Sequence, residues 1–143
     1  MIAVDTNVLL RRLLDDDATQ SARARRLFDA EAEILITDVV LAEAVWTLKG
    51  KRYKASAAQV AEIVTGLLEE PNVVFEDAAA VWSALNDYVA AATPESSSAG
   101  AADFADALIV NKARATARIR QAPYRGTYTY DEAALALDGM KAL

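Results

Sequence analysis

The stretch Ile2-Ala3-Val4-Asp5-Thr6-Asn7-Val8-Leu9-Leu10 joins a short apolar run to an apolar-rich helical segment through three polar residues. Its first three residues are typical of a short buried strand. Two similar apolar runs lie at 34–36 and 73–75, and an alternating run lies at 127–130, with helical patterns between them. Strands that alternate with helices predict an α/β fold, in which helices cover both faces of a parallel sheet.

Helices are expected at seven places where apolar residues recur with helical spacing or a capping residue opens the segment. The segments are 8–14, 21–32, 39–49, 56–69, 77–92, 102–116 and 132–137. The stretch 93–100 is rich in Ser, Pro and Gly and predicts a loop. A length of 143 residues without an internal repeat or a linker predicts a single domain over 1–143.

Composition excludes several classes of protein. No apolar run approaches the length of a membrane span, and no basic segment precedes the apolar start, so we expect a cytoplasmic protein without a membrane anchor. The chain has no Cys and no His. Disulfides, thiolate chemistry, histidine general bases and His-ligated zinc are therefore excluded. The polar chemistry of an enzyme of this composition would rest mainly on Asp, Glu, Lys, Arg, Ser, Thr and Tyr, which favours carboxylates with hard metal ions.

Charge is distributed unevenly along a chain whose net charge is −6. Residues 55–111 contain nine acids and neither Lys nor Arg. Two short stretches are basic, and they contain Lys49, Lys51 and Arg52 in the first, and Lys112, Arg114 and Arg118 in the second. Either stretch is a solvated surface or a place where RNA phosphates bind, and we treat these six residues as candidate RNA contacts.

Five carboxylates occupy positions that suggest a site. Asp5 and Asp131 each follow a predicted strand directly, where open parallel sheets bind their ligands. Glu43 lies within the apolar segment 39–46, and Asp103 and Asp106 lie within another at 101–109, spaced to share a helix face.

An ionised carboxylate in an apolar helix is costly to desolvate and requires a cation or hydrogen bonds. Bound Mg²⁺ or Mn²⁺ would compensate several such groups together, and these ions need neither Cys nor His. Each acid also has a structural interpretation. Asp5 and Asp131 can cap helices, Asp103 can interact with a helix dipole, and Glu43 can lie on a polar helix edge.

Four motifs in the same order and spacing resemble the PIN-domain family, specifically its VapC-type ribonuclease toxins. The first is Val4-Asp5-Thr6-Asn7-Val8-Leu9-Leu10-Arg11, and the second, 36–48, contains Glu43. The third, 102–109, contains the sequence Asp103-Phe104-Ala105-Asp106. The fourth is Thr127-Tyr128-Thr129-Tyr130-Asp131, in which Tyr130 stands where the family usually has Phe.

The resemblance implies a three-layer α/β/α sandwich around a central parallel sheet, and a metal-dependent endoribonuclease. It implies that Asp5, Glu43, Asp106 and Asp131 form the acidic site, with Asp103 as a frequent companion, and that one or two Mg²⁺ or Mn²⁺ ions bind there. Thr6, Asn7 and Thr129 would orient the carboxylates or water. It also implies a homodimer and a cognate VapB-type antitoxin as partner.

Apolar helix side chains would form the antitoxin groove, and we expect some of the following to line it: Leu9, Leu10, Leu13, Leu14, Trp46, Leu48 and Trp82. Two other functions remain open. A flap-type DNA nuclease uses the same acids and metal, and a non-catalytic PIN-like module would bind RNA or a partner without cutting. The segment 118–126 is longer and more basic than the compact turn usual before the last strand, so the assignment of Asp131 rests mainly on the resemblance.

Overall fold

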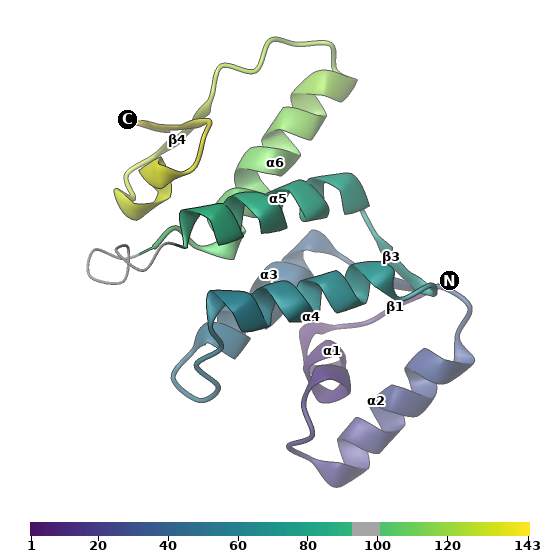
Figure 1. The fold of residues 1–143 in the computed structure, drawn as a ribbon. Helices are drawn as coiled ribbons and strands as arrows, with labels where there is room; N and C mark the ends of the chain where they lie inside the picture. The colour runs from purple at the N-terminus through teal and green to yellow at the C-terminus, as the bar shows by residue number, and fades with distance from the viewer. Residues whose placement is uncertain (93–100) are drawn as a thin grey trace. The chain divides into compact units, whose positions relative to one another are not determined.

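The computed structural model describes residues 1–92 and 101–143 (Figure 1). Residues 93–100, where a loop was expected, lie outside the described residues. The chain divides into two compact units, a first unit over Met1–Ala78 and a second unit over Ala79–Leu143.

A parallel sheet of three short strands forms the centre of the first unit. The strands are β1 (Ile2–Ala3), β2 (Ile34–Ile36) and β3 (Val73–Phe75), hydrogen-bonded in that order. Ile2 pairs with Ile34, and Ile34 pairs with Val73, so the three strands run in register. Because they are parallel, their carboxyl ends lie at one edge, and the residues that follow each strand share that edge.

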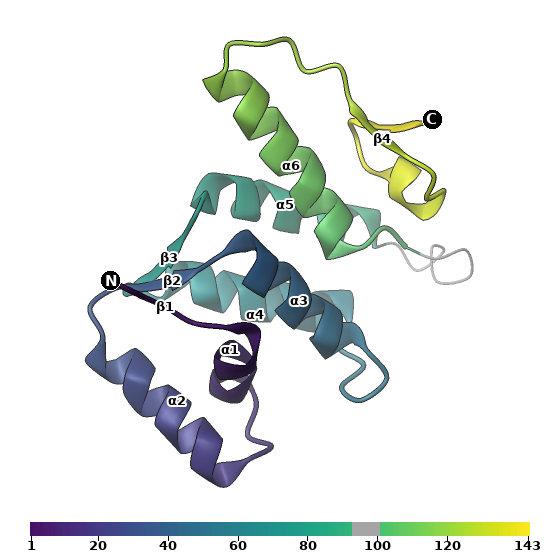
Figure 2. The ribbon, with the colours of Figure 1, turned by 180° about the vertical axis from the view of Figure 1, so that it is seen from behind.

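Four helices accompany this sheet, and each begins at a residue whose side chain accepts a backbone hydrogen bond. They are α1 (Thr6–Leu13), α2 (Ala18–Ala30), α3 (Asp38–Lys49) and α4 (Ala57–Glu69), capped by Asp5, Asp17, Thr37 and Ser56. α1 packs against α2 and α3, and α3 packs against α4 (Figure 2). Leu9, Ile34, Ile36, Val60 and Val64 are fully buried and form the core of the unit.

The second unit contains α5 (Ala78–Ala91), whose first residue belongs to the first unit, and α6 (Phe104–Ile119). Tyr88 of α5 meets Phe104 of α6 edge to face, with ring centroids 5.9 Å apart. A parallel pair of strands follows, β4 (Thr127–Thr129) and β5 (Met140–Ala142), joined by a 3-10 turn at Ala133–Ala136. The Arg114 guanidinium donates to the Asp138 backbone oxygen and carboxylate, both at 2.6 Å, and so ties α6 to this last segment.

The α/β class with parallel strands is confirmed, and most elements lie within a few residues of their predicted bounds. The structure differs from the prediction at two places near the end of the chain. The closing helix expected at 132–137 is a short 3-10 helix over Ala133–Ala136, and β5 was not expected. Met140-Lys141-Ala142 carries no β-branched residue and no alternation, so its strand forms only through pairing with β4. α6 also continues to Ile119, past its predicted end.

The apolar side chains expected to line a partner groove divide into two groups. Leu9 and Leu48 are 0% and 3% exposed, so they belong to the core, which corrects the expectation for these two. Leu10, Leu13 and Leu14 are half-buried, whereas Trp46 and Trp82 are exposed. Helical spacing alone does not separate these groups, because a wide apolar face includes both buried and surface positions.

Candidate active site

Asp5 lies two residues beyond β1 and caps α1. Its backbone is extended, and its Oδ1 accepts the Val8 N–H at 2.8 Å. Within residues 1–92 and 101–143, its second oxygen, Oδ2, has no hydrogen-bond partner, and the residue is exposed. The capping role expected as the structural interpretation is therefore real, but it uses only one of the two carboxylate oxygens. The other oxygen is available to a ligand.

Glu43 reaches the same neighbourhood from α3. The Thr6 hydroxyl donates to Glu43 Oε2 at 2.6 Å, and Thr6 directly follows Asp5. The structure thus connects Glu43 to the residue that follows Asp5, and the Thr6 hydroxyl fixes the position of the glutamate carboxylate. Glu43 is exposed, however, so the expectation that it is costly to desolvate inside an apolar helix was wrong. It lies on the solvent-facing side of α3 and can be charged there without a bound cation.

Two further acids lie at this edge of the sheet and were missed by sequence reasoning. Asp38 follows β2 and Glu76 follows β3, as Asp5 follows β1. Glu76 Oε2 accepts the Asp38 N–H at 2.6 Å and so supports the start of α3. The strand-end position that marks Asp5 also marks Asp38 and Glu76. The motifs of the family resemblance do not assign a site role to these two acids.

Asp103 and Asp106 form the N-terminus of α6 in the second unit. Asp103 is the capping residue, and its Oδ1 accepts the Phe104 N–H at 2.8 Å. Asp106 Oδ2 accepts the Asp103 N–H at 3.0 Å, which completes a capping box. Asp103 therefore lies just before the helix, not inside it as predicted. Hydrogen bonding within the box stabilises both half-buried carboxylates, so Asp106 does not require a metal ion to compensate its charge.

Asp131 lies in the turn after β4, where the motif placed it. Its backbone N–H donates to Thr129 Oγ1 at 2.9 Å, and its Oδ1 accepts the Ala133 N–H at the same distance. Thr129 therefore positions the backbone of Asp131 and does not contact its carboxylate. Asp131 is exposed, and as with Asp5, one carboxylate oxygen remains unbonded among the described residues.

The five predicted acids thus fall into two sets. Asp5 and Glu43 meet through Thr6 in the first unit, while Asp103 and Asp106 share a capping box in the second, which also contains Asp131. Within the described ranges 1–92 and 101–143, no three Asp or Glu side chains form a group that could hold a metal ion. The chemistry of the Asp5 and Glu43 donors nonetheless fits a hard divalent ion, because each offers an oxygen that has no hydrogen-bond partner in those ranges.

Asp16 centres a network that holds the basic loop after α3. It accepts the Tyr53 hydroxyl at 2.7 Å and Arg11 Nη1 at 2.5 Å, and Arg52 Nη2 lies 3.4 Å away. The Tyr53 hydrogen bond, followed by that of Arg11, lowers the pKa of Asp16 below its ordinary value of 3.8. The same bond to Asp16 raises the pKa of Tyr53 above 10.0.

These shifts predict how stability depends on pH. Folding lowers the pKa of Asp16. Its ionised carboxylate therefore contributes to the free energy of unfolding above pH 3.8, and this contribution is lost as the pH falls through the folded-state pKa. We expect the stability difference between the parent and Asp16→Asn to shrink as the pH falls below about 4, measured by urea unfolding. Asp29→Asn is the control, since the Asp29 side chain is exposed and makes no hydrogen bond within the described residues. A difference that stays constant down to about pH 2 would contradict this assignment.

None of the helices in the described ranges is both long and apolar enough to cross a membrane. Comparison with known proteins gives one family. The model of the PIN domain matches residues 2–120, which include both units up to the end of α6. Searches of curated proteins and of solved structures found no significant match. PIN domains are generally nucleases, so at that coarse level the chain is a hydrolase. Because the match covers most of its length, the chain belongs to the PIN domain family.

Proposed function

We propose that this protein is a metal-dependent endoribonuclease, a VapC-type toxin that hydrolyses RNA phosphodiester bonds. The observation that carries the proposal is the pair Asp5 and Glu43 at the carboxyl edge of a parallel sheet, joined by Thr6. Membership of the PIN family supports a nuclease, and the absence of His and Cys leaves carboxylates as the groups that can do this chemistry.

Asp5, Glu43, Asp106 and Asp131 would hold one or two Mg²⁺ or Mn²⁺ ions, with Asp103 as an accessory acid. When bound, such an ion lowers the pKa of water and offsets charge on the phosphate. Thr6 fixes the Glu43 carboxylate, and Thr129 fixes the turn that presents Asp131. Asn7 follows in the first turn of α1, where we propose that it orients water or substrate.

RNA contacts come from the basic stretches. We retain Lys49, Lys51 and Arg52 near α3, and Lys112 and Arg118 on α6, as candidates for phosphate binding. We leave out Arg114, because its side chain is only 25% exposed and its guanidinium is held at 2.6 Å by both the backbone oxygen and the carboxylate of Asp138. The Arg114 guanidinium would have to break these contacts to bind a phosphate.

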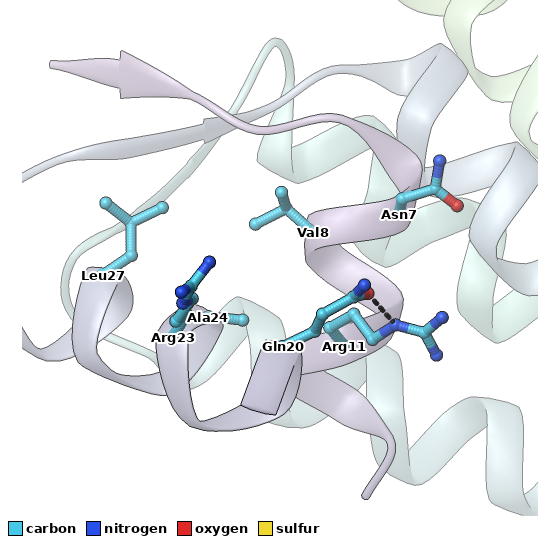
Figure 3. A pocket seen from close by; sticks show the side chains of 7 residues that line it. All are labelled: Asn7, Val8, Arg11, Gln20, Arg23, Ala24 and Leu27. Atoms are coloured by element: carbon cyan, nitrogen blue, oxygen red, sulfur yellow. Dashed lines mark hydrogen bonds between the residues drawn. The ribbon is translucent and has the colours of Figure 1, made fainter. Parts of the chain in front are cut away.

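For the antitoxin, we propose the groove between α1 and α2, a pocket of about 380 Å³ (Figure 3). Val8, Ala24 and Leu27 supply apolar surface, and the exposed Arg23 supplies positive charge. This combination suits an amphipathic helix with acidic flanks. Inhibition of RNA cleavage by the antitoxin is the measurement for this partner. A homodimer, a single domain over 1–143 and a cytoplasmic location also belong to this proposal.

The rival with most support is a non-catalytic module. Asp5, Asp103, Asp106 and Asp131 all make the local hydrogen bonds of capping or turn residues, which an inert domain would also need. Calorimetric titration with Mn²⁺ separates the two functions, because an inert site would give no binding heat. A flap-type DNA nuclease is distinguished by substrate.

Metal removal gives the direct test of the proposed function. We expect the purified protein to cleave single-stranded RNA with Mg²⁺ or Mn²⁺, and to lose all detectable cleavage in excess EDTA, because no His or Cys can replace the metal-bound nucleophile. A DNA of the same sequence serves as the matched substrate control. Full cleavage in EDTA would overturn the mechanism, and faster cleavage of branched DNA than of RNA would favour the flap-nuclease reading.

A further inference from the structure

A second pocket of the first unit is lined by residues of α1 and of the end of α3, the helices that also carry Thr6 and Glu43. It measures about 360 Å³ and is lined by residues that include Asn7, Leu10, Trp46, Thr47, Lys51 and Arg52. Asn7 follows Thr6, the residue that holds Glu43, and Trp46 and Thr47 lie one helical turn beyond Glu43 on α3. Residues that line the pocket are therefore neighbours, along both helices, of the residues Thr6 and Glu43.

Trp46 is the dominant apolar surface of this pocket. It is 69% exposed, although an indole of this size is normally buried at least in part. The position three residues after Glu43 places both side chains on one face of α3. Trp46 thus offers an aromatic surface to solvent next to the acids.

The positive charges of the pocket are of two kinds. Arg11 is held by Asp16 at 2.5 Å and by Gln20 at 2.7 Å, so it serves the fold. Lys51 is exposed and makes no ion pair among the described residues, and Arg52 is 71% exposed with only the 3.4 Å pair to Asp16. Two cations are therefore available to an anionic ligand, in a chain whose net charge is −6.

The loop that carries these cations is held in place. Lys54 and Ala55 donate backbone hydrogen bonds to Gly50 and Leu48, both at 2.9 Å. The Tyr53 hydroxyl binds Asp16, and the Arg52 guanidinium lies 5.1 Å from the centroid of the Tyr53 ring. Because Arg52 already covers one face of Tyr53, the residue suited to stack on a base is Trp46 rather than Tyr53.

We propose that this pocket is a nucleotide subsite for single-stranded RNA, in which Trp46 stacks on an unpaired base while Lys51 and Arg52 bind its phosphate. The inference rests on the proposed function and names the substrate class for the same site. An aromatic surface with adjacent cations suits a nucleotide, which presents a planar base and an anionic phosphate together. A base-paired strand keeps its bases stacked internally, so the subsite selects unpaired RNA.

The experiment uses the full chain with Asp5→Asn, so that RNA is bound but not cut, in Mg²⁺ buffer. The ligand is a fluorescein-labelled oligouridylate, compared with the same strand in a duplex. Trp82→Phe leaves Trp46 as the only tryptophan, and we expect its fluorescence to be quenched by the single strand. Trp46→Ala should weaken binding roughly 5- to 150-fold, the effect of losing one stacked base. The double variant Lys51→Gln and Arg52→Gln should reduce the steepness with which the logarithm of the binding constant falls with the logarithm of salt concentration, by about 1 to 2.

Matched controls test whether these effects are local. Trp82→Ala removes the other tryptophan, which is 50% exposed on α5, and Arg26→Gln removes an exposed cation of α2. Both should bind the oligouridylate within about twofold of the parent.

The proposed subsite is wrong if the affinity of Trp46→Ala for the oligouridylate is within twofold of that of the parent. If that variant instead changes the molecular mass measured by light scattering, the face is a protein interface, which also overturns the subsite. Failure of the proposed function has a different signature. If the parent neither cuts nor binds RNA, the proposed function and the subsite are both refuted. If the parent and Trp46→Ala cut RNA at the same rate, only the subsite is refuted.

Discussion

Asp5→Asn is expected to reduce RNA cleavage at least 100-fold while leaving the free energy of unfolding unchanged within error. The reduction follows from the loss of a metal-ligand charge, because several kcal/mol of transition-state stabilisation correspond to two or more powers of ten in rate. The unchanged stability follows from the cap. Asp5 Oδ1 accepts the Val8 N–H at 2.8 Å, and the Asn amide oxygen makes the same bond.

Two companion variants separate charge from structure. Asp5→Ala removes the cap as well, and should cost about 1 kcal/mol of stability in addition to the loss of cleavage. Asp17 is the matched control, since it caps α2 through the same bond, accepting the Gln20 N–H at 2.8 Å, but lies outside the proposed site. Asp17→Asn should leave both cleavage and stability unchanged. Equal cleavage by Asp5→Asn and Asp17→Asn would mean that Asp5 is only a cap.

The sequence predicted the elements of the first unit well, because each is encoded locally. Apolar runs of three residues mark β2 and β3, and Ser56 with Gln59 marks the start of α4 by a capping box that the structure contains. β5 escaped prediction because its residues have no strand pattern of their own. The Asp16 network escaped because Tyr53 lies 37 residues from Asp16 in sequence, and local patterns do not report such contacts.

Motif spacing selected the residues of the candidate site, but the surroundings of those residues could not be predicted from it. It selected Asp5 and Glu43, and in the structure the Thr6 hydroxyl donates to Glu43. Periodicity suggested that Glu43 and Asp106 would be buried ions, yet Glu43 is exposed and Asp106 is bonded within a capping box. An apolar run gives the composition of a helix, but which face meets the core depends on packing partners that are distant in sequence.

Phe104→Ala is expected to lower stability more than any other substitution considered, by about 3 to 5 kcal/mol. Phe104 is fully buried in the first turn of α6, and its ring meets Tyr88 edge to face. Truncation leaves a cavity and removes the contact that joins α5 and α6. For a chain of this length, the loss corresponds to a fall in Tm of roughly 10 to 20 °C in thermal unfolding.

Ile109→Ala provides the control, because Ile109 lies on the same helix and is 52% exposed. Its truncation should change stability by no more than about 0.5 kcal/mol. Tyr88→Phe tests the other ring of this pair. The substitution keeps the ring, so it should retain most of the aromatic contact with Phe104. If Phe104→Ala lowers Tm no more than Ile109→Ala does, the packing of α5 on α6 through these rings is not what holds the second unit. The capping box alone would then hold Asp103 and Asp106 in place, and Asp106→Ala would destabilise the protein more than Phe104→Ala does.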